Sequence, residues 1–75
     1  MNYIELSKLI QSITPAFTEN DFMKPFKETT IDSLDLITIR VSIEKEIKSK
    51  ISNEQWFEFE SVNDILQYLL QKENF

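Results

Sequence analysis

The sequence predicts an all-α domain: a small four-helix bundle made of three longer helices and a short third helix, with a long first loop. Two observations support this fold class. Apolar residues recur at intervals of three and four along separate stretches of the chain, which is typical of helices with one buried face. Residues that cap or stop helices stand at the ends of these stretches. Because 75 residues suffice for one small domain with a thin core, we treat residues 1–75 as a single domain.

The first helix is predicted over residues 3–13. Its apolar face consists of residues spaced by three and four, namely Tyr3, Leu6, Ile10 and Ile13. Pro15 ends this helix, because the residue before a proline disfavours the α conformation.

A long loop is predicted over residues 15–31, and a short helical turn around Glu19–Met23 is compatible with its sequence. We expect three aromatic residues to anchor the loop to the core, namely Phe17, Phe22 and Phe26. So long a connection in so small a domain is often functional.

The second helix, predicted over residues 33–48, carries two apolar stripes. We assign one stripe to the core, namely Leu36, Ile39, Ile43 and Ile47. Leu34, Ile37 and Val41 form the other stripe, roughly 100–160° around the helix from Leu36. A surface helix needs only one apolar face. The second stripe is therefore either part of a wide buried arc or a face that meets a partner enzyme, and the pattern alone favours neither.

The end of the chain predicts a short third helix and a closing fourth helix. Ser52 is the predicted cap of the short helix, which runs through Trp56 and Phe57. The fourth helix is predicted to start at Ser61 and to bury one face, made of Val62, Ile65, Leu66 and Leu69. We expect residues 73–75 to fray.

The aromatic residues of the third helix, Trp56, Phe57 and Phe59, are expected to be core residues. A lining for a ligand pocket is the less favoured interpretation. Arg40 lies at the edge of the core face of the second helix, and we favour a snorkelling side chain over a partner contact for it.

Composition excludes several classes of function. The chain has no cysteine and no histidine, so it offers no thiolate and lacks the usual general base and the commonest metal ligand. We expect no catalytic residues and no metal site. A net charge of −5 disfavours nucleic acid as a partner and favours basic protein surfaces. With no membrane span and no signal-peptide pattern, we expect a cytoplasmic, monomeric protein that does not bind membranes.

The tetrad Asp32-Ser33-Leu34-Asp35 lies where the long loop becomes the second helix. Asp32 is a suitable N-cap, and Asp35 stands at the position that a capping box requires. Ser33 then takes the first helical position, with its hydroxyl at the positive end of the helix dipole. Helix N-termini stabilise anions, so this serine is well placed to carry a phosphate ester.

The chain resembles the acyl carrier protein family over nearly its whole length. The tetrad matches the family's attachment signature in full, and the order of helices and loops is the same. Further matching positions are the segment Ile43-Glu44-Lys45-Glu46-Ile47, the residue Ile51, and the pair Ser61-Val62.

The resemblance implies a non-enzymatic carrier with a 4′-phosphopantetheine arm on Ser33. The arm would hold acyl groups as thioesters and present them to acyl-transferring, condensing or other enzymes of fatty acid, polyketide or related biosynthesis. The resemblance also implies that Asp32 helps to place Ser33 for a phosphopantetheinyl transferase. Partner contacts are expected from a set of residues on the second helix, namely Leu34, Asp35, Ile37, Val41 and Glu44.

Two departures from the family pattern stand out. The family has a glycine shortly before the modified serine, whereas this chain has Thr29-Thr30-Ile31 there. The family's second helix is strongly acidic, whereas residues 32–50 balance four acids (Asp32, Asp35, Glu44, Glu46) against four bases (Arg40, Lys45, Lys48, Lys50). This balance predicts a dedicated partner with its own charge pattern.

Two alternative functions stay open at this point. One is an aminoacyl or peptidyl carrier of a nonribosomal pathway, and the other is an unmodified helical protein-interaction module. The acid directly before Ser33 and the acid after Leu34 favour the acyl type over the aminoacyl type.

Overall fold

The computed structural model describes residues 1–73, and every regular element within this range is helical. The elements are α1 (Tyr3–Ile13), two 3₁₀ turns η1 (Glu19–Asp21) and η2 (Phe26–Glu28), then α2 (Ser33–Ile47), α3 (Asn53–Glu58) and α4 (Val62–Glu73). The predicted all-α fold and helix order are confirmed. Of the residues 73–75 that were expected to fray, Glu73 is the last residue of α4, and residues 74 and 75 lie outside the described residues. None of the described helices is long and apolar enough to cross a membrane.

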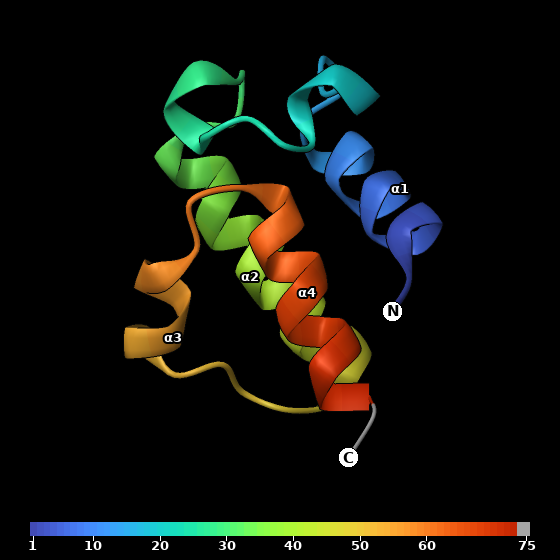
Figure 1. Cartoon of the computed structure of the whole chain (residues 1–75), viewed down its shortest axis with the longest axis vertical. Coiled ribbons are helices and arrows are strands. Elements are labelled where there is room, and N and C mark those ends of the chain that lie inside the picture. The colour runs from blue at the N-terminus through green and yellow to red at the C-terminus, as the bar shows by residue number, and fades with distance from the viewer. Residues whose placement is uncertain (74–75) are drawn as a thin grey trace.

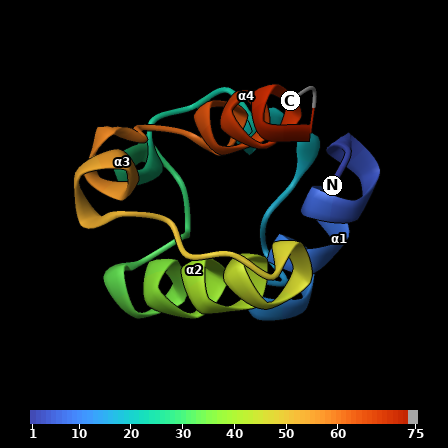
Figure 2. The same cartoon turned by 90° about the horizontal axis from the view of Figure 1, so that it is seen from below.

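The helices surround one hydrophobic core. In Figure 1, α4 runs in front of α2, with α1 on one side, α3 on the other and the first loop across the top. Figure 2 shows α2 and α4 on opposite sides of the molecule. The core joins residues from all four helices, the first loop and the segments on either side of α3, namely Leu6, Ile10, Phe17, Phe22, Ile31, Ile39, Ile43, Ile51, Trp56, Phe59, Val62, Ile65, Leu66 and Leu69.

Side-chain caps fix where the helices begin. At α1, the Glu5 N–H donates to Asn2 Oδ1 at 2.9 Å, and the Glu5 carboxylate accepts from the Asn2 N–H at 3.2 Å. At α3, Ser52 Oγ accepts from the Gln55 N–H at 3.1 Å, as predicted. Each cap satisfies N–H groups that the first helical turn would otherwise leave without a partner.

The start of α4 differs in detail from the predicted capping box. Ser61 Oγ accepts from the Asp64 N–H at 3.3 Å, as expected. The Asp64 carboxylate, however, accepts from the N–H of Glu60 at 2.8 Å rather than from that of Ser61. The reciprocal bond therefore ties down the residue before the cap, which fixes the entry of the chain into α4.

The long first loop is held against the start of α4. The Phe26 N–H donates to the Glu60 carbonyl at 2.8 Å, and the Asn63 N–H donates to the Phe22 carbonyl at 3.1 Å. Phe17 and Phe22 are buried and Phe26 is half-buried, so all three predicted anchors contact the core. The short turn expected near Glu19 is present as η1, whereas η2 was not anticipated.

The two apolar stripes of α2 differ in burial. Ile39 and Ile43 are fully buried, while Leu36 and Ile47 are half-buried against the core. The second stripe is exposed, with fractions of 72% for Leu34, 61% for Ile37 and 52% for Val41. The interpretation as a wide buried arc is therefore wrong, because no other element of the described chain covers this side of α2.

The expectation that Phe57 belongs to the core is also wrong. Its side chain is 79% exposed, whereas Trp56 and Phe59 are buried. Because α3 is a single short helix lying on the core, only one of its sides can be covered. Phe57 follows Trp56 by about 100° around that helix and so faces outward.

The burial of α2 generates a stability prediction for a matched pair of isoleucines. Ile43→Ala is expected to lower the free energy of unfolding by about 2–5 kcal/mol, because it leaves a cavity in the core. Ile37→Ala should change it by no more than about 0.5 kcal/mol, as is usual for exposed positions. Urea denaturation followed by circular dichroism measures both, and equal losses would contradict the assignment of the two stripes.

Candidate functional site

The predicted capping box at the start of α2 is present. The Asp35 N–H donates to Asp32 Oδ1 at 2.8 Å, and the Asp32 N–H donates to Asp35 Oδ2 at 3.4 Å. Ser33 is the first residue of the helix and is exposed. Its hydroxyl makes no hydrogen bond within residues 1–73, so it is free to react at the positive end of the helix dipole.

A threonine organises the loop just before the tetrad, in the stretch where the family pattern has a glycine and this chain has none. Thr29 Oγ1 donates to the Phe26 carbonyl at 2.7 Å and accepts from the Ile31 N–H at 3.1 Å. Ile31 is buried, which holds the chain on the core directly before Asp32. Among the described residues only Lys48 has a positive φ, so this loop needs no glycine.

An apolar groove lies beside Ser33. Its volume is about 270 Å³, and its walls come from η2, α2 and the α3 region, with Phe26, Ser33, Leu36, Ile37, Trp56, Phe57 and Phe59 as the lining residues. Trp56 and Phe59 pack edge to face, with ring centroids 5.5 Å apart. The serine thus stands at a surface where an apolar group attached to it can leave water.

The side chains of Glu44 and Arg40 bind the segment that follows α2. The Ile51 N–H donates to Glu44 Oε2 at 2.7 Å, and Arg40 Nη2 donates to the Ile51 carbonyl at 2.6 Å. Arg40 also bonds Asn53 Oδ1 at 2.9 Å and lies 5.7 Å from the centre of the Trp56 ring. The two side chains of α2 therefore satisfy both backbone groups of a buried residue and hold α3 in place.

This network changes two expectations from the sequence. Arg40 is not a simple snorkelling residue, since its guanidinium binds the segment after α2 rather than extending into solvent. The Glu44 side chain is only 11% exposed and pairs with Arg40 at 3.7 Å. We therefore leave Glu44 out of the candidate partner surface, because its carboxylate is already engaged.

The remaining predicted site residues lie at the first turns of α2. Leu34, Ile37 and Val41 form one exposed stripe. Asp35 is half-buried, bonds back to Asp32, and lies about 100° around the helix from Leu34. Within residues 1–73, no group of three or more histidine, cysteine, aspartate or glutamate side chains could hold a metal ion.

In this small helical bundle, a free serine hydroxyl lies at a helix N-terminus beside an apolar groove, where a group attached through a phosphate would be stabilised. The family model described as the phosphopantetheine attachment site matches residues 5–69. The chain belongs to this family. A sequence comparison with curated proteins finds no match.

Membership defines the cofactor and the general role. Domains of this family are the attachment site for a covalent 4′-phosphopantetheine group, and they work with a transferase and with partner enzymes. The residues described here fit such a group, because a free hydroxyl lies at the N-terminus of α2 with an apolar groove beside it.

The inward-facing carboxylate generates a second stability prediction. Glu44→Ala should lower the free energy of unfolding by about 1–3 kcal/mol, since it leaves the buried Ile51 N–H without an acceptor. Glu44→Gln keeps an acceptor oxygen and should recover part of the loss. The exposed Glu58, whose side chain makes no hydrogen bond or ion pair within residues 1–73, is the control, and Glu58→Ala should change stability by no more than about 0.5 kcal/mol. Thermal and urea unfolding measure all three, and a Glu44 loss no larger than that of Glu58 would contradict the network's role.

Proposed function

We propose that residues 1–75 form an acyl carrier protein that bears its 4′-phosphopantetheine arm on Ser33. The protein presents acyl groups to acyl-transferring, condensing or related enzymes of fatty acid, polyketide or similar biosynthesis, and itself catalyses no reaction. The single observation that carries the proposal is the free, exposed hydroxyl of Ser33 on a capped helix N-terminus, inside the matched family region.

The chain's own residues contribute placement and electrostatics. Asp32 accepts the Asp35 N–H and so fixes the first turn of α2, which holds Ser33 at the surface. The helix N-terminus favours the negative charge of a phosphodiester at that hydroxyl. The arm itself supplies a terminal thiol that carries the cargo.

The groove beside Ser33 favours acyl cargo over aminoacyl cargo. Its walls are apolar and aromatic except for the serine, and no buried charged side chain lies among them to pair with an amino group. At about 270 Å³ the groove is slightly smaller than typical ligand pockets, which span about 300–1,000 Å³. Short to medium apolar chains match that size.

The proposed partner face is the exposed stripe of Leu34, Ile37 and Val41, with Asp35 at its edge. It begins one residue after Ser33, so an enzyme that binds it has Ser33 and, once attached, the arm within reach. The phosphopantetheinyl transferase is the enzyme that would bind this face before the arm is attached.

The attachment site is tested by mass spectrometry. Incubation with coenzyme A and a broad-specificity phosphopantetheinyl transferase should add one arm, and Ser33→Ala should abolish the addition. Ser52, another exposed serine at a helix start, is the matched control, and Ser52→Ala should still be modified. A wild-type chain left unmodified by several transferases would instead indicate an unmodified interaction module.

The cargo groove is tested by loading the arm. A medium-length acyl chain should change the fluorescence of Trp56, which is the only tryptophan of the chain. It should also raise the melting temperature, because a group buried only in the folded state stabilises that state. A gain of about 1 kcal/mol corresponds to a rise of about 4–8 °C in a domain of this size. An acetyl group is the control, and equal values for both cargoes would contradict the groove as their site.

A further inference from the structure

The exposed stripe of α2 continues past its apolar part into lysines. On the helix, Lys45 follows Leu34, Ile37 and Val41 at intervals of three and four, and these four positions fall within an arc of about 80°. Lys48 lies just past the helix, as its left-handed C-cap. The stripe is therefore apolar in the turns next to Ser33 and basic at the far end of the helix.

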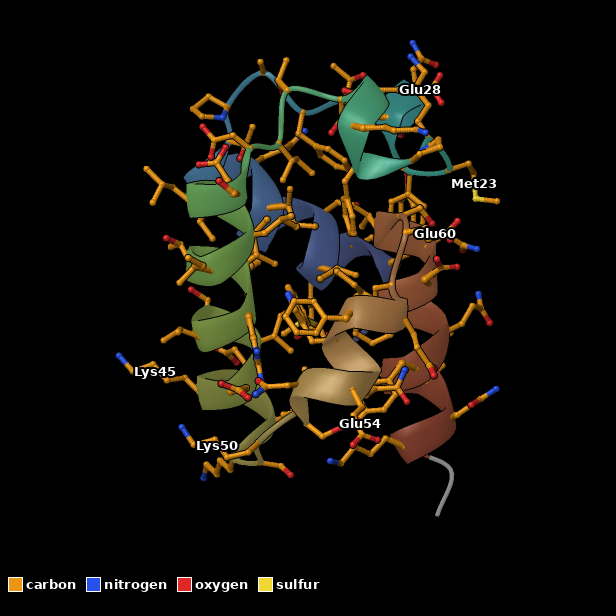
Figure 3. All side chains as sticks on the ribbon, turned by 90° about the vertical axis from the view of Figure 1, so that its left-hand side faces the viewer. Met23, Glu28, Lys45, Lys50, Glu54 and Glu60 are labelled. Atoms are coloured by element: carbon orange, nitrogen blue, oxygen red, sulfur yellow. The ribbon has the colours of Figure 1, made fainter. Side chains whose placement is uncertain are left out.

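The basic end is open to solvent and uncommitted. Lys45, Lys48 and Lys50 are exposed, and none forms an ion pair within residues 1–73. Figure 3 shows Lys45 and Lys50 extending outward from the last turn of α2 and the segment after it. A shallow hollow joins the apolar and basic parts, lined by Val41, Glu44, Lys45, Lys48, Ser49 and Lys50.

The acids nearest to this stripe do not neutralise it. The Glu44 carboxylate is bonded to the Ile51 N–H and paired with Arg40. Glu46 follows Lys45 by about 100° around the helix and so lies off the stripe. The local charge of the far end is thus positive, although the whole chain carries −5.

We propose that this face docks a partner enzyme whose surface pairs an apolar patch with an acidic patch. The apolar patch covers Leu34, Ile37 and Val41, and the acidic patch meets the lysines, which lie about 17–21 Å along the axis of α2 from Leu34 at 1.5 Å per residue. This proposal rests on the proposed function, because the partner is an enzyme that uses the arm at Ser33. The chain's net charge by itself would favour a basic partner surface, whereas the lysines of α2 favour an acidic patch.

A local protein patch fits this face better than an extended anionic surface does. Outside residues 32–50 the chain has nine acids and four bases, from totals of thirteen and eight less four of each. A membrane or a nucleic acid is an extended anionic surface that meets the field of the whole chain, and the net charge of −5 opposes its approach. An enzyme can place its acidic groups opposite the lysines alone.

Two designed helical peptides test the charge of the partner surface. One carries leucines along the first half of one face and glutamates along the second half, and its twin has lysines in place of the glutamates. Binding to ¹⁵N-labelled protein, with and without the arm, is followed by amide chemical shifts. The chain's net charge alone would favour the basic twin, so a preference for the acidic peptide reports the local lysines.

The acidic peptide should bind about three- to tenfold tighter than its twin, as expected of a few exposed ion pairs. The shifts should follow the stripe from Leu34 to Lys48. The Lys45→Glu/Lys48→Glu double variant should reverse the preference. Lys8→Glu/Lys27→Glu makes the same change in net charge at exposed positions off the stripe and should preserve it. Ile37→Ala should weaken both peptides.

Several outcomes would overturn the proposal. Equal binding of the two peptides, tighter binding of the basic twin, or shifts away from the stripe would do so. Lysine-dependent binding to anionic phosphatidylglycerol vesicles, or lysine-dependent self-association, would assign the face to a membrane or to a second copy. If the chain accepts the arm but binds both peptides equally, the docking proposal fails and the carrier function stands. If the chain prefers the acidic peptide but accepts no arm at Ser33, the carrier function fails and the charge of the docking face stands.

Discussion

The arrangement of the site depends on two side chains of α2 that satisfy the backbone of Ile51. Glu44 accepts its N–H and Arg40 binds its carbonyl, while Arg40 also reaches Asn53 and the face of Trp56. A buried residue outside regular secondary structure needs partners for both groups, and here a neighbouring helix provides them. This contact fixes where α3 begins relative to α2, and thus where Trp56 and Phe59 meet Leu36 to wall the groove beside Ser33.

α2 divides its surface among three tasks. One side buries Ile39 and Ile43 in the core, and a second side holds the segment after the helix through Arg40 and Glu44. The third side stays exposed, apolar near Ser33 and basic at its far end. Only one of the two apolar stripes is therefore buried in the core, and the other, which stays exposed, is the partner face of the proposed function.

The first loop does its work without glycine. Thr29 closes the turn before the tetrad, and two backbone hydrogen bonds fasten the loop to the start of α4. Because these hydrogen bonds hold the second half of the loop against the rest of the fold, Ser33 follows a fixed segment of chain. A fixed attachment point suits a carrier, because a partner enzyme can then bind the protein with the attached arm starting from a defined position.

The helix positions, the caps at Asp32 and Ser52 and the place of Ser33 could be predicted from the sequence, because periodicity, capping and helix dipoles act within a few residues. The tertiary structure alone decided that Leu34, Ile37 and Val41 are exposed and that Phe57 faces outward, since burial depends on which neighbours cover a face. It alone also decided the roles of Arg40 and Glu44, whose partners lie seven to thirteen residues further along the chain. The spacing of residues along a helix cannot show whether a carboxylate is free or accepts a hydrogen bond from a later segment of the chain.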